Sequence, residues 1–194
     1  MPGTLKLKSE AGGSVVLTAN TNAATDLTVN ISPVAGTLAT LVANTTGPYF
    51  AQGGVAGNGP AFSAYGSSAT SLTNGGYTKV AFQTKEFDTN SNFDNTTNYR
   101  FTPTVAGYYQ VNAGVAANFS SGESTIYIYK NGSRFKNGQD NGAVSYQVNI
   151  SSLIYLNGSS DYIEIYVYQG TGSAINTNTS SQACWFQASM VRSA

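Results

Sequence analysis

Two short stretches of alternating residues decide the fold class: Ser124–Lys130 (STIYIYK) and Asp161–Gln169 (DYIEIYVYQ). In the first, two isoleucines alternate with two tyrosines, and the second repeats the pattern with isoleucine and valine against tyrosine and glutamate. Successive side chains of a strand point to opposite faces, so this period of two predicts strands with one aliphatic face and one tyrosine face. We expect the aliphatic side chains to fill the core of an all-β sandwich.

The tyrosine face is predicted to be a contact surface. Rows of large aromatic side chains rarely stay in water on a monomer, and tyrosine suits an interface because its ring buries area while its hydroxyl finds a partner. The alternative is that these tyrosines only decorate a hydrophilic sheet. The residues predicted to form the contact are Tyr127, Tyr129, Tyr162, Glu164, Tyr166 and Tyr168.

The same kind of alternation predicts further strands, and no stretch shows a sustained helical pattern. Six Asn-Gly pairs, beginning at residues 58, 74, 131, 137, 141 and 157, predict hairpin turns because both residues tolerate positive φ. The remaining strands are expected at Tyr77–Gln83, Tyr108–Phe119, Val144–Leu156 and Ala183–Val191.

Composition excludes several classes of function. The 194 residues are 41% hydrophobic but only 9% charged, and 9 basic residues balance 9 acidic ones, so no basic face for nucleic acid is expected. The absence of histidine excludes Ser–His–Asp and Cys–His nucleophile systems, and a single cysteine excludes an intrachain disulfide. No apolar run approaches the roughly 20 residues of a membrane span. The first residues lack the pattern of a signal peptide, so we expect a protein made and kept in a cytoplasm.

The chain divides by composition into three parts. Residues 1–47 contain no aromatic residue and alternate weakly, which predicts a β-rich anchoring arm. Residues 48–59 are rich in glycine and form a predicted linker, and residues 60–194 form the predicted head. The apolar residues expected to anchor the arm are Leu5, Leu7, Val15, Leu17, Leu27, Val29, Ile31, Leu38 and Leu41.

The head resembles the globular domain of complement C1q and its relatives in the tumour-necrosis-factor superfamily. The resemblance covers roughly 130 residues in the same order, and its pieces are Pro60–Ala64, Phe87–Asn92, Asn98–Pro103, Ala106–Val111, Tyr129–Gly132, Leu156–Ile163 and Trp185–Met190. Two serines separate Gly158 from Asp161, and Ala188 stands where the family prefers glycine.

This resemblance implies a jelly-roll protomer that assembles as a homotrimer, with outward aromatics of one sheet packed around the threefold axis. We therefore expect the predicted contact residues to form the trimer interface. The chain has no Gly-X-Y repeats of the kind found in family members with collagen stalks, so a secreted complement-like role is not implied.

The arm resembles a segment found in structural proteins of tailed bacteriophages. The resemblance lies in Gly3–Leu7, Val15–Leu17 and above all Ile31–Leu41 (ISPVAGTLATL). It implies a non-enzymatic virion protein, assembled in the host cytoplasm and carried on the virion surface. Its expected partners are other copies of itself and, through the arm, virion proteins such as the major capsid protein.

Neither heptads nor a repeated shaft is present, which favours a capsid decoration (cement) protein or short head fibre. The alternative is a tail fibre or tail spike tip that binds a receptor or a host surface glycan.

Four further features carry separate hypotheses. Oxygen-bearing side chains alternate at Asp88, Asn90, Asn92 and Asp94, a spacing that could wrap calcium, although Asx-rich turns give the same pattern. Glu164 with the nearby Asp161 could suggest a glycosidase pair, but a buried or interfacial Glu164 matched by Lys130, Arg134 or a tyrosine hydroxyl is favoured. Cys184 is expected to be a small buried hydrophobe. The polar connections expected at the tip of the head are Ser120–Glu123, Arg134–Asn141 and Gly170–Ser181.

Overall fold

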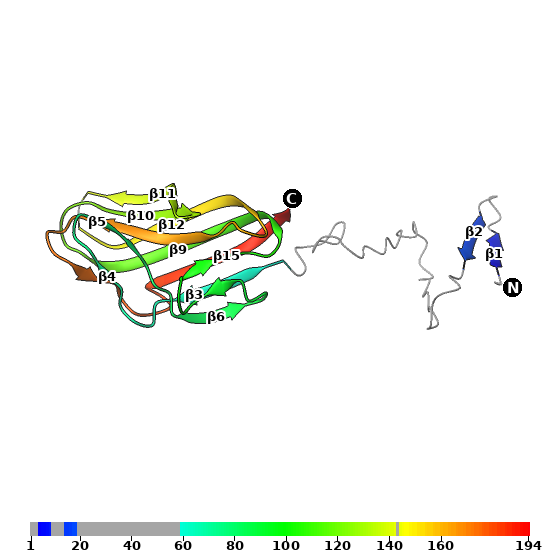
Figure 1. The fold of residues 1–194 in the computed structure, drawn as a ribbon, viewed down its shortest axis with the longest axis horizontal. Helices are drawn as coiled ribbons and strands as arrows, with labels where there is room; N and C mark the ends of the chain where they lie inside the picture. The colour runs from blue at the N-terminus through cyan, green and yellow to red at the C-terminus, as the bar shows by residue number, and fades with distance from the viewer. Residues whose placement is uncertain (1–3, 9–13, 19–58, 143) are drawn as a thin grey trace. The chain divides into compact units, whose positions relative to one another are not determined.

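The computed structural model describes residues 4–8, 14–18, 59–142 and 144–194, and within them every pairing between strands is antiparallel and no residue is helical. Two five-stranded sheets pack face to face as a jelly-roll sandwich (Figure 1). One sheet has the order β11 (Ser133–Asn141), β10 (Ser124–Lys130), β13 (Ile163–Gln169), β8 (Arg100–Phe101) and β7 (Phe93–Asp94). The other has the order β12 (Ser145–Asn157), β9 (Ala106–Phe119), β15 (Cys184–Ser193), β3 (Ala61–Tyr65) and β6 (Thr84–Asp88).

Short strands extend this framework. The strand β14 (Ile175–Asn176) pairs with β4 (Ser71–Leu72). The strand β5 (Gly76–Lys79) runs beside β13, where the N–H of Val80 donates to the carbonyl of Ile165 at 2.9 Å. We name the first five-stranded sheet the tyrosine sheet and the second the β9 sheet, after its long strand.

The predicted alternation of the tyrosine sheet is confirmed. The aliphatic residues of β10 and β13 are fully buried in the core, namely Ile126, Ile128, Ile163, Ile165 and Val167. Burying each such side chain contributes about 1.5–3 kcal/mol relative to leaving it exposed. The two strands are paired residue by residue from Ser124 opposite Gln169 to Lys130 opposite Ile163, so both present their aliphatic residues to the same side.

Aromatic packing ties the two sheets together at one end of the sandwich. The ring of Phe62 on β3 stacks on Phe93 and Phe101 of the tyrosine sheet, with centroid distances of 4.5 and 4.7 Å. Phe186 on β15 meets the same ring edge-on at 4.9 Å. Residues that are far apart in the sequence therefore share one buried cluster, which explains why the short strands β7 and β8 are held in place.

One predicted loop is a strand. Residues 134–141 were expected as a polar connection, but they form most of β11, which pairs with β10 at the edge of the tyrosine sheet. Nearly every side chain of β11 is exposed, so no apolar alternation marks it in the sequence. The predicted turn at Asn137-Gly138 is therefore wrong: it lies within β11, where a Cβ on Gly138 would meet Ile126 and Ile150 at 2.6 Å. Residue 138 is a glycine because Ile126 and Ile150 lie too close to leave room for a side chain.

The Asn-Gly turn at residues 131 and 132 is confirmed. Both residues have positive φ, 54° and 76°, and they join β10 to β11 as a tight hairpin. This is the conformation that favours Asn-Gly in two-residue hairpin loops.

Residues Met1–Ala43 and Asn44–Ala194 form two separate units. In the first, β1 (Thr4–Lys8) pairs with β2 (Ser14–Thr18), and Leu5 lies opposite Leu17 and Leu7 opposite Val15, as expected of the predicted strand periodicity. Leu27, Val29, Ile31, Leu38 and Leu41 lie outside the described residues, so their anchoring role stays a prediction. The predicted boundary at residue 47 also lies outside the described residues.

Cys184 is buried on β15, as predicted. Burial raises the pKa of its thiol to about 12, which keeps the sulfur protonated and unreactive at neutral pH.

We expect Gly158→Ala to destabilise the head more than Gly75→Ala. Both glycines have a left-handed φ, 71° and 67°, which costs an alanine about 1–2 kcal/mol. A Cβ on Gly158 would also overlap the backbone of Val105 and Ala106, whereas nothing lies within 4 Å of one on Gly75. Urea denaturation of the two variants measures the difference, and equal losses would show that the close approach at Gly158 is not a constraint.

Candidate functional site

The predicted contact residues do lie together on the outer face of the tyrosine sheet. Tyr129 stacks on Tyr166 with centroids 3.9 Å apart and the rings 23° from parallel. Tyr77, from β5, joins the group at 5.4 Å from Tyr127 and 5.3 Å from Tyr168. Tyr77 is not among the predicted contact residues, because nothing in the sequence shows that β5 runs beside β13.

These tyrosines already bury much of one another within a single chain. Tyr127 is 4% exposed and Glu164 is 5% exposed, so these two offer little surface to a partner. Desolvation accompanies this packing and raises the pKa of Tyr127, Tyr129 and Tyr166 above the ordinary value of 10.0. The role of the six residues as a trimer interface stays a prediction.

Charged residues are part of the same face. Glu164 is paired with Lys79 at 3.1 Å, a partner from β5 rather than the Lys130, Arg134 or tyrosine hydroxyl expected from the sequence. The guanidinium of Arg134 lies 5.5 Å from the centre of the Tyr127 ring, and Arg100 lies 4.3 Å from that of Tyr162. The outer face of the tyrosine sheet is thus an aromatic surface crossed by charges.

The outer face of the β9 sheet has a different character. The four strands β12, β9, β15 and β3 contain one charged residue, Arg192, near the end of β15. Large apolar side chains are exposed there: Tyr108 and Tyr155 lie opposite each other with ring centroids 5.6 Å apart, and Leu153 is 55% exposed. We name the outward surface of these four strands the uncharged face. The sequence does not reveal this face, because nothing in it shows that these strands are neighbours.

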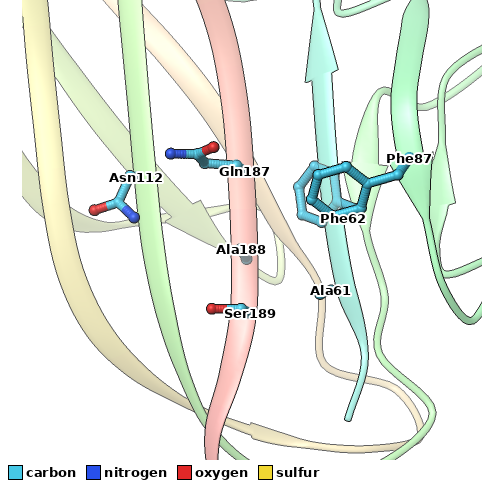
Figure 2. Close-up of a pocket in the computed structure, with 7 residues that line it drawn as sticks. All are labelled: Ala61, Phe62, Phe87, Asn112, Gln187, Ala188 and Ser189. Carbon is cyan, nitrogen blue, oxygen red and sulfur yellow. The ribbon is translucent and has the colours of Figure 1, made fainter. Parts of the chain in front are cut away.

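A groove of about 200 Å³ lies on the uncharged face and extends to β6 (Figure 2). Asn112 of β9 and Gln187 of β15 are register partners across it, and Ser189 and the exposed ring of Phe87 also line it. Figure 2 shows the carboxamide of Gln187 extending from β15 toward the strand that carries Asn112. The groove therefore combines an aromatic ring with uncharged hydrogen-bonding groups.

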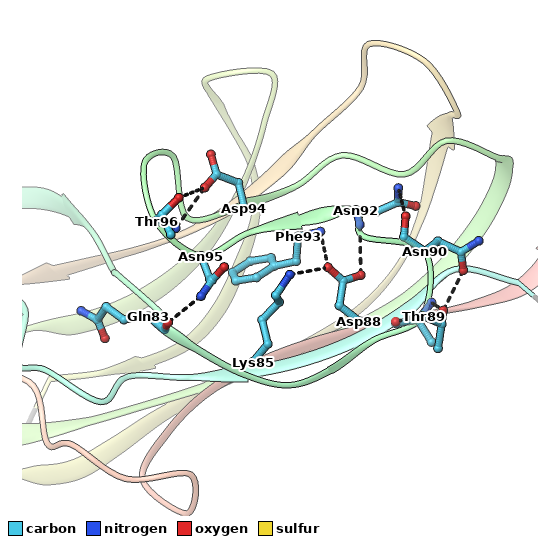
Figure 3. A network of polar contacts seen from close by, with 11 residues as sticks. Gln83, Lys85, Asp88, Thr89, Asn90, Asn92, Phe93, Asp94, Asn95 and Thr96 are labelled. Carbon is cyan, nitrogen blue, oxygen red and sulfur yellow. Dashed lines mark hydrogen bonds and ion pairs between the residues drawn. The ribbon is translucent and has the colours of Figure 1, made fainter.

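The candidate calcium ligands lie in one loop, but their oxygens are occupied by the chain itself (Figure 3). The carboxylate of Asp88 accepts hydrogen bonds from the backbone N–H groups of Asn92 and Phe93 and pairs with Lys85 at 3.2 Å. Asn90 accepts from the hydroxyl of Thr89. Asx turns of this kind match the alternative stated above. Binding of calcium to Asp88, Asn90, Asn92 and Asp94 stays a prediction.

Asp94 is the most heavily hydrogen-bonded acid in the described part of the chain. Its two oxygens accept from the backbone N–H groups of Thr96, Thr97 and Asn98 and from the side chains of Thr96 and Asn98. These bonds hold the pKa of Asp94 far below its ordinary value. Across the described residues, no group of three or more acidic or cysteine side chains gathers as metal ligands do.

Asp161 joins two turns at one end of the sandwich. Its carboxylate pairs with Lys130 at 2.8 Å and accepts hydrogen bonds from the Asn131 side chain at 2.7 Å and the Asn157 N–H at 3.1 Å. Burial alone would raise the pKa of Asp161, but these hydrogen bonds and the Lys130 charge outweigh burial and lower it. Asp161 is therefore a structural acid.

Of the predicted tip connections, two are loops in the structure. Residues 120–123 and most of residues 170–181 connect strands, with short β14 inside the latter, whereas residues 134–141 belong to β11. Gln169 stabilises the second loop through its buried amide. This amide donates to the carbonyls of Leu72 and Ser173 and accepts from Thr171. None of the described residues forms a helix able to span a bilayer.

Comparisons with known proteins support the fold. No protein-family model matches the sequence, and no curated protein sequence is similar to it. Murine APRIL is similar in structure over 68% of this chain and 98% of its own, at 10% identity and a TM-score of 0.55. The globular domain of zebrafish complement 1qA is similar over 70% of this chain and 99% of its own, at 18% identity and a TM-score of 0.52. The PRD1 vertex protein P5 is 17% identical over 72% of this chain and 99% of its own, with a TM-score of 0.49, too low to support a conclusion. The head therefore has the C1q-like jelly-roll fold that the resemblance implied.

Replacing Asp161 with asparagine is expected to destabilise the head by about 1–3 kcal/mol at neutral pH, because a charge-assisted contact to Lys130 is lost. The folded-state pKa of Asp161 lies below the ordinary 3.8, so its contribution is complete above that pH and disappears as the pH falls through the folded value. Urea denaturation of both proteins at neutral pH and below pH 3.8 should show the difference shrinking with acid. A difference that does not change with pH would contradict this assignment.

Proposed function

We propose that this chain is a non-enzymatic, homotrimeric structural protein of a tailed-phage virion. Its arm attaches to the particle and its C1q-like head projects outward, as a capsid decoration protein or short head fibre. The observation that carries the homotrimer is the uncharged face, because a sheet surface with exposed tyrosine and leucine and almost no charge has the composition of an interface core. The C1q-like fold of the head is consistent with it.

The virion role rests on the arm. The segment Ile31–Leu41 resembles structural proteins of tailed bacteriophages, and the hairpin of β1 and β2 precedes it in the chain. A hairpin leaves two strand edges unpaired, and such edges are suited to pairing with a sheet of another protein. The major capsid protein is the partner proposed for this edge.

The roles proposed for the acidic residues are structural. Glu164 is paired with Lys79, Asp161 with Lys130 and Asp88 with Lys85, so these carboxylates are occupied by cations of the same chain. A general acid and base would need carboxyl groups aimed at a shared substrate space. This arrangement supports a role in assembly rather than in catalysis.

Immunogold labelling of intact phage particles, with an antibody against the head, tests the location. We expect gold over the whole capsid surface. Gold confined to the tail would replace decoration with the alternative function, a tip protein that binds a receptor or a surface glycan. Unlabelled particles would overturn the virion role altogether, and a preimmune serum provides the control.

A truncated chain of residues 48–194 is expected to stay trimeric but to lose attachment to particles, because it retains the folded unit and lacks the arm. Light scattering measures its mass, and co-sedimentation with particles that lack the protein measures attachment. Attachment by the truncated chain would show that the head, not the arm, is the anchor.

A further inference from the structure

We propose that copies of this chain meet through the uncharged face, and that Asn112 and Gln187 form a polar band at the centre of the contact, where their amides hydrogen-bond to those of neighbouring copies. This inference rests on the proposed homotrimer and names the surface and residues that build it.

The distribution of charge separates the two outer faces. The tyrosine sheet carries charged residues on all five of its strands, including Arg134 on β11 and the buried Glu164 on β13. On the β9 sheet, charges are confined to the edge strand β6 and to Arg192. An antiparallel sheet with one face in water usually alternates apolar with polar residues, and charge is then normal on the wet side. Four neighbouring strands with a single charge indicate a face that is covered.

Symmetry explains why the covering partner is a second copy. Near a rotation axis each side chain lies close to its own equivalents, so any charged residue would face like charges. Asparagine and glutamine avoid this conflict because each amide carries both donors and an acceptor, and so complements an identical group. A different protein as partner would impose no such restriction, and complementary charges would then be expected.

In the structure, the NH₂ group of Asn112 and the amide of Gln187 are available for such contacts. The Oδ1 of Asn112 accepts from Ser151 at 2.8 Å and from Gln110 at 3.2 Å, which turns its NH₂ group away from them. Within the described part of the chain, no hydrogen bond engages the amide of Gln187 or the hydroxyl of Ser189. These donors and acceptors line the groove of Figure 2 and are available to a neighbour.

Apolar side chains flank the band on both sides. The register places Tyr108 and Tyr155 in a row on one side of it, and Trp185 and Tyr65 in a row on the other. Aromatic rows on either side exclude water from the polar centre, and a buried polar centre fixes one register because any shift leaves its amides unpaired.

The test is the full chain with Asn112→Asp and Gln187→Glu together. Both changes keep the side-chain shape, and a carboxylate at residue 112 still accepts from Ser151 and Gln110, so the protomer remains folded. We expect the dissociation constant of the trimer to rise by about two orders of magnitude or more at neutral pH, measured by sedimentation equilibrium. At about pH 3, below the ordinary pKa of such carboxyl groups, the trimer should form again. The charged groups of this sheet, on β6 and at Arg192, are the same in the wild type measured alongside.

The control carries Asn137→Asp and Gln182→Glu, both exposed and outside the uncharged face, and it should remain trimeric. If the wild-type chain is monomeric, the proposed homotrimer itself is wrong. If the wild type is trimeric and the double variant at residues 112 and 187 is equally trimeric at neutral pH, the trimer stands and the polar band is wrong. Dissociation that persists at about pH 3 in a folded variant, or that the control shares, would also overturn the band.

Discussion

The residue-by-residue pairing of β10 with β13 is the constraint on which the rest of the head depends. It places the aliphatic side chains of both strands on one side, and a slip of one residue in either strand would turn that strand's aliphatic side chains to the solvent. The buried row packs against the inward side of the β9 sheet, and this contact positions β9 and β15 as the long central strands. The two outer faces, one aromatic and charged and the other nearly free of charge, both follow from this arrangement.

Polar contacts, rather than disulfides, stabilise the loops that connect the strands. Asp94 binds the loop that follows it through three backbone N–H groups, and Asp161 joins the Asn131-Gly132 turn to the turn after β12. Gln169 is fully buried and uses both ends of its amide to hold the segments on either side. Each group is placed so that backbone donors or acceptors in the loops are satisfied, which is a condition for ordering segments with so few large apolar residues.

The fold class could be predicted because a period of two is visible in single strands. The core of β10 and β13, the Asn131-Gly132 hairpin and the burial of Cys184 all follow from local patterns of this kind. The edge strand β11 could not be recognised, since both of its sides are exposed and its Asn137-Gly138 pair imitates a turn. Ion pairs between residues far apart in the sequence could not be predicted either. The partner of Glu164 is Lys79, 85 residues away, and no local sequence pattern connects them. The uncharged face was visible only in part, as three strands without acidic or basic residues whose adjacency the sequence does not reveal.

The burial of Cys184 makes the two outer faces separately addressable by chemistry. It is the single cysteine of the chain, it lies inside the sandwich, and its thiol stays protonated at neutral pH. A thiol-reactive fluorophore or spin label therefore has no native target in the folded head. A cysteine introduced on either outer face can be labelled alone while Cys184 stays in place, so the surroundings of each face can be followed separately in the intact assembly.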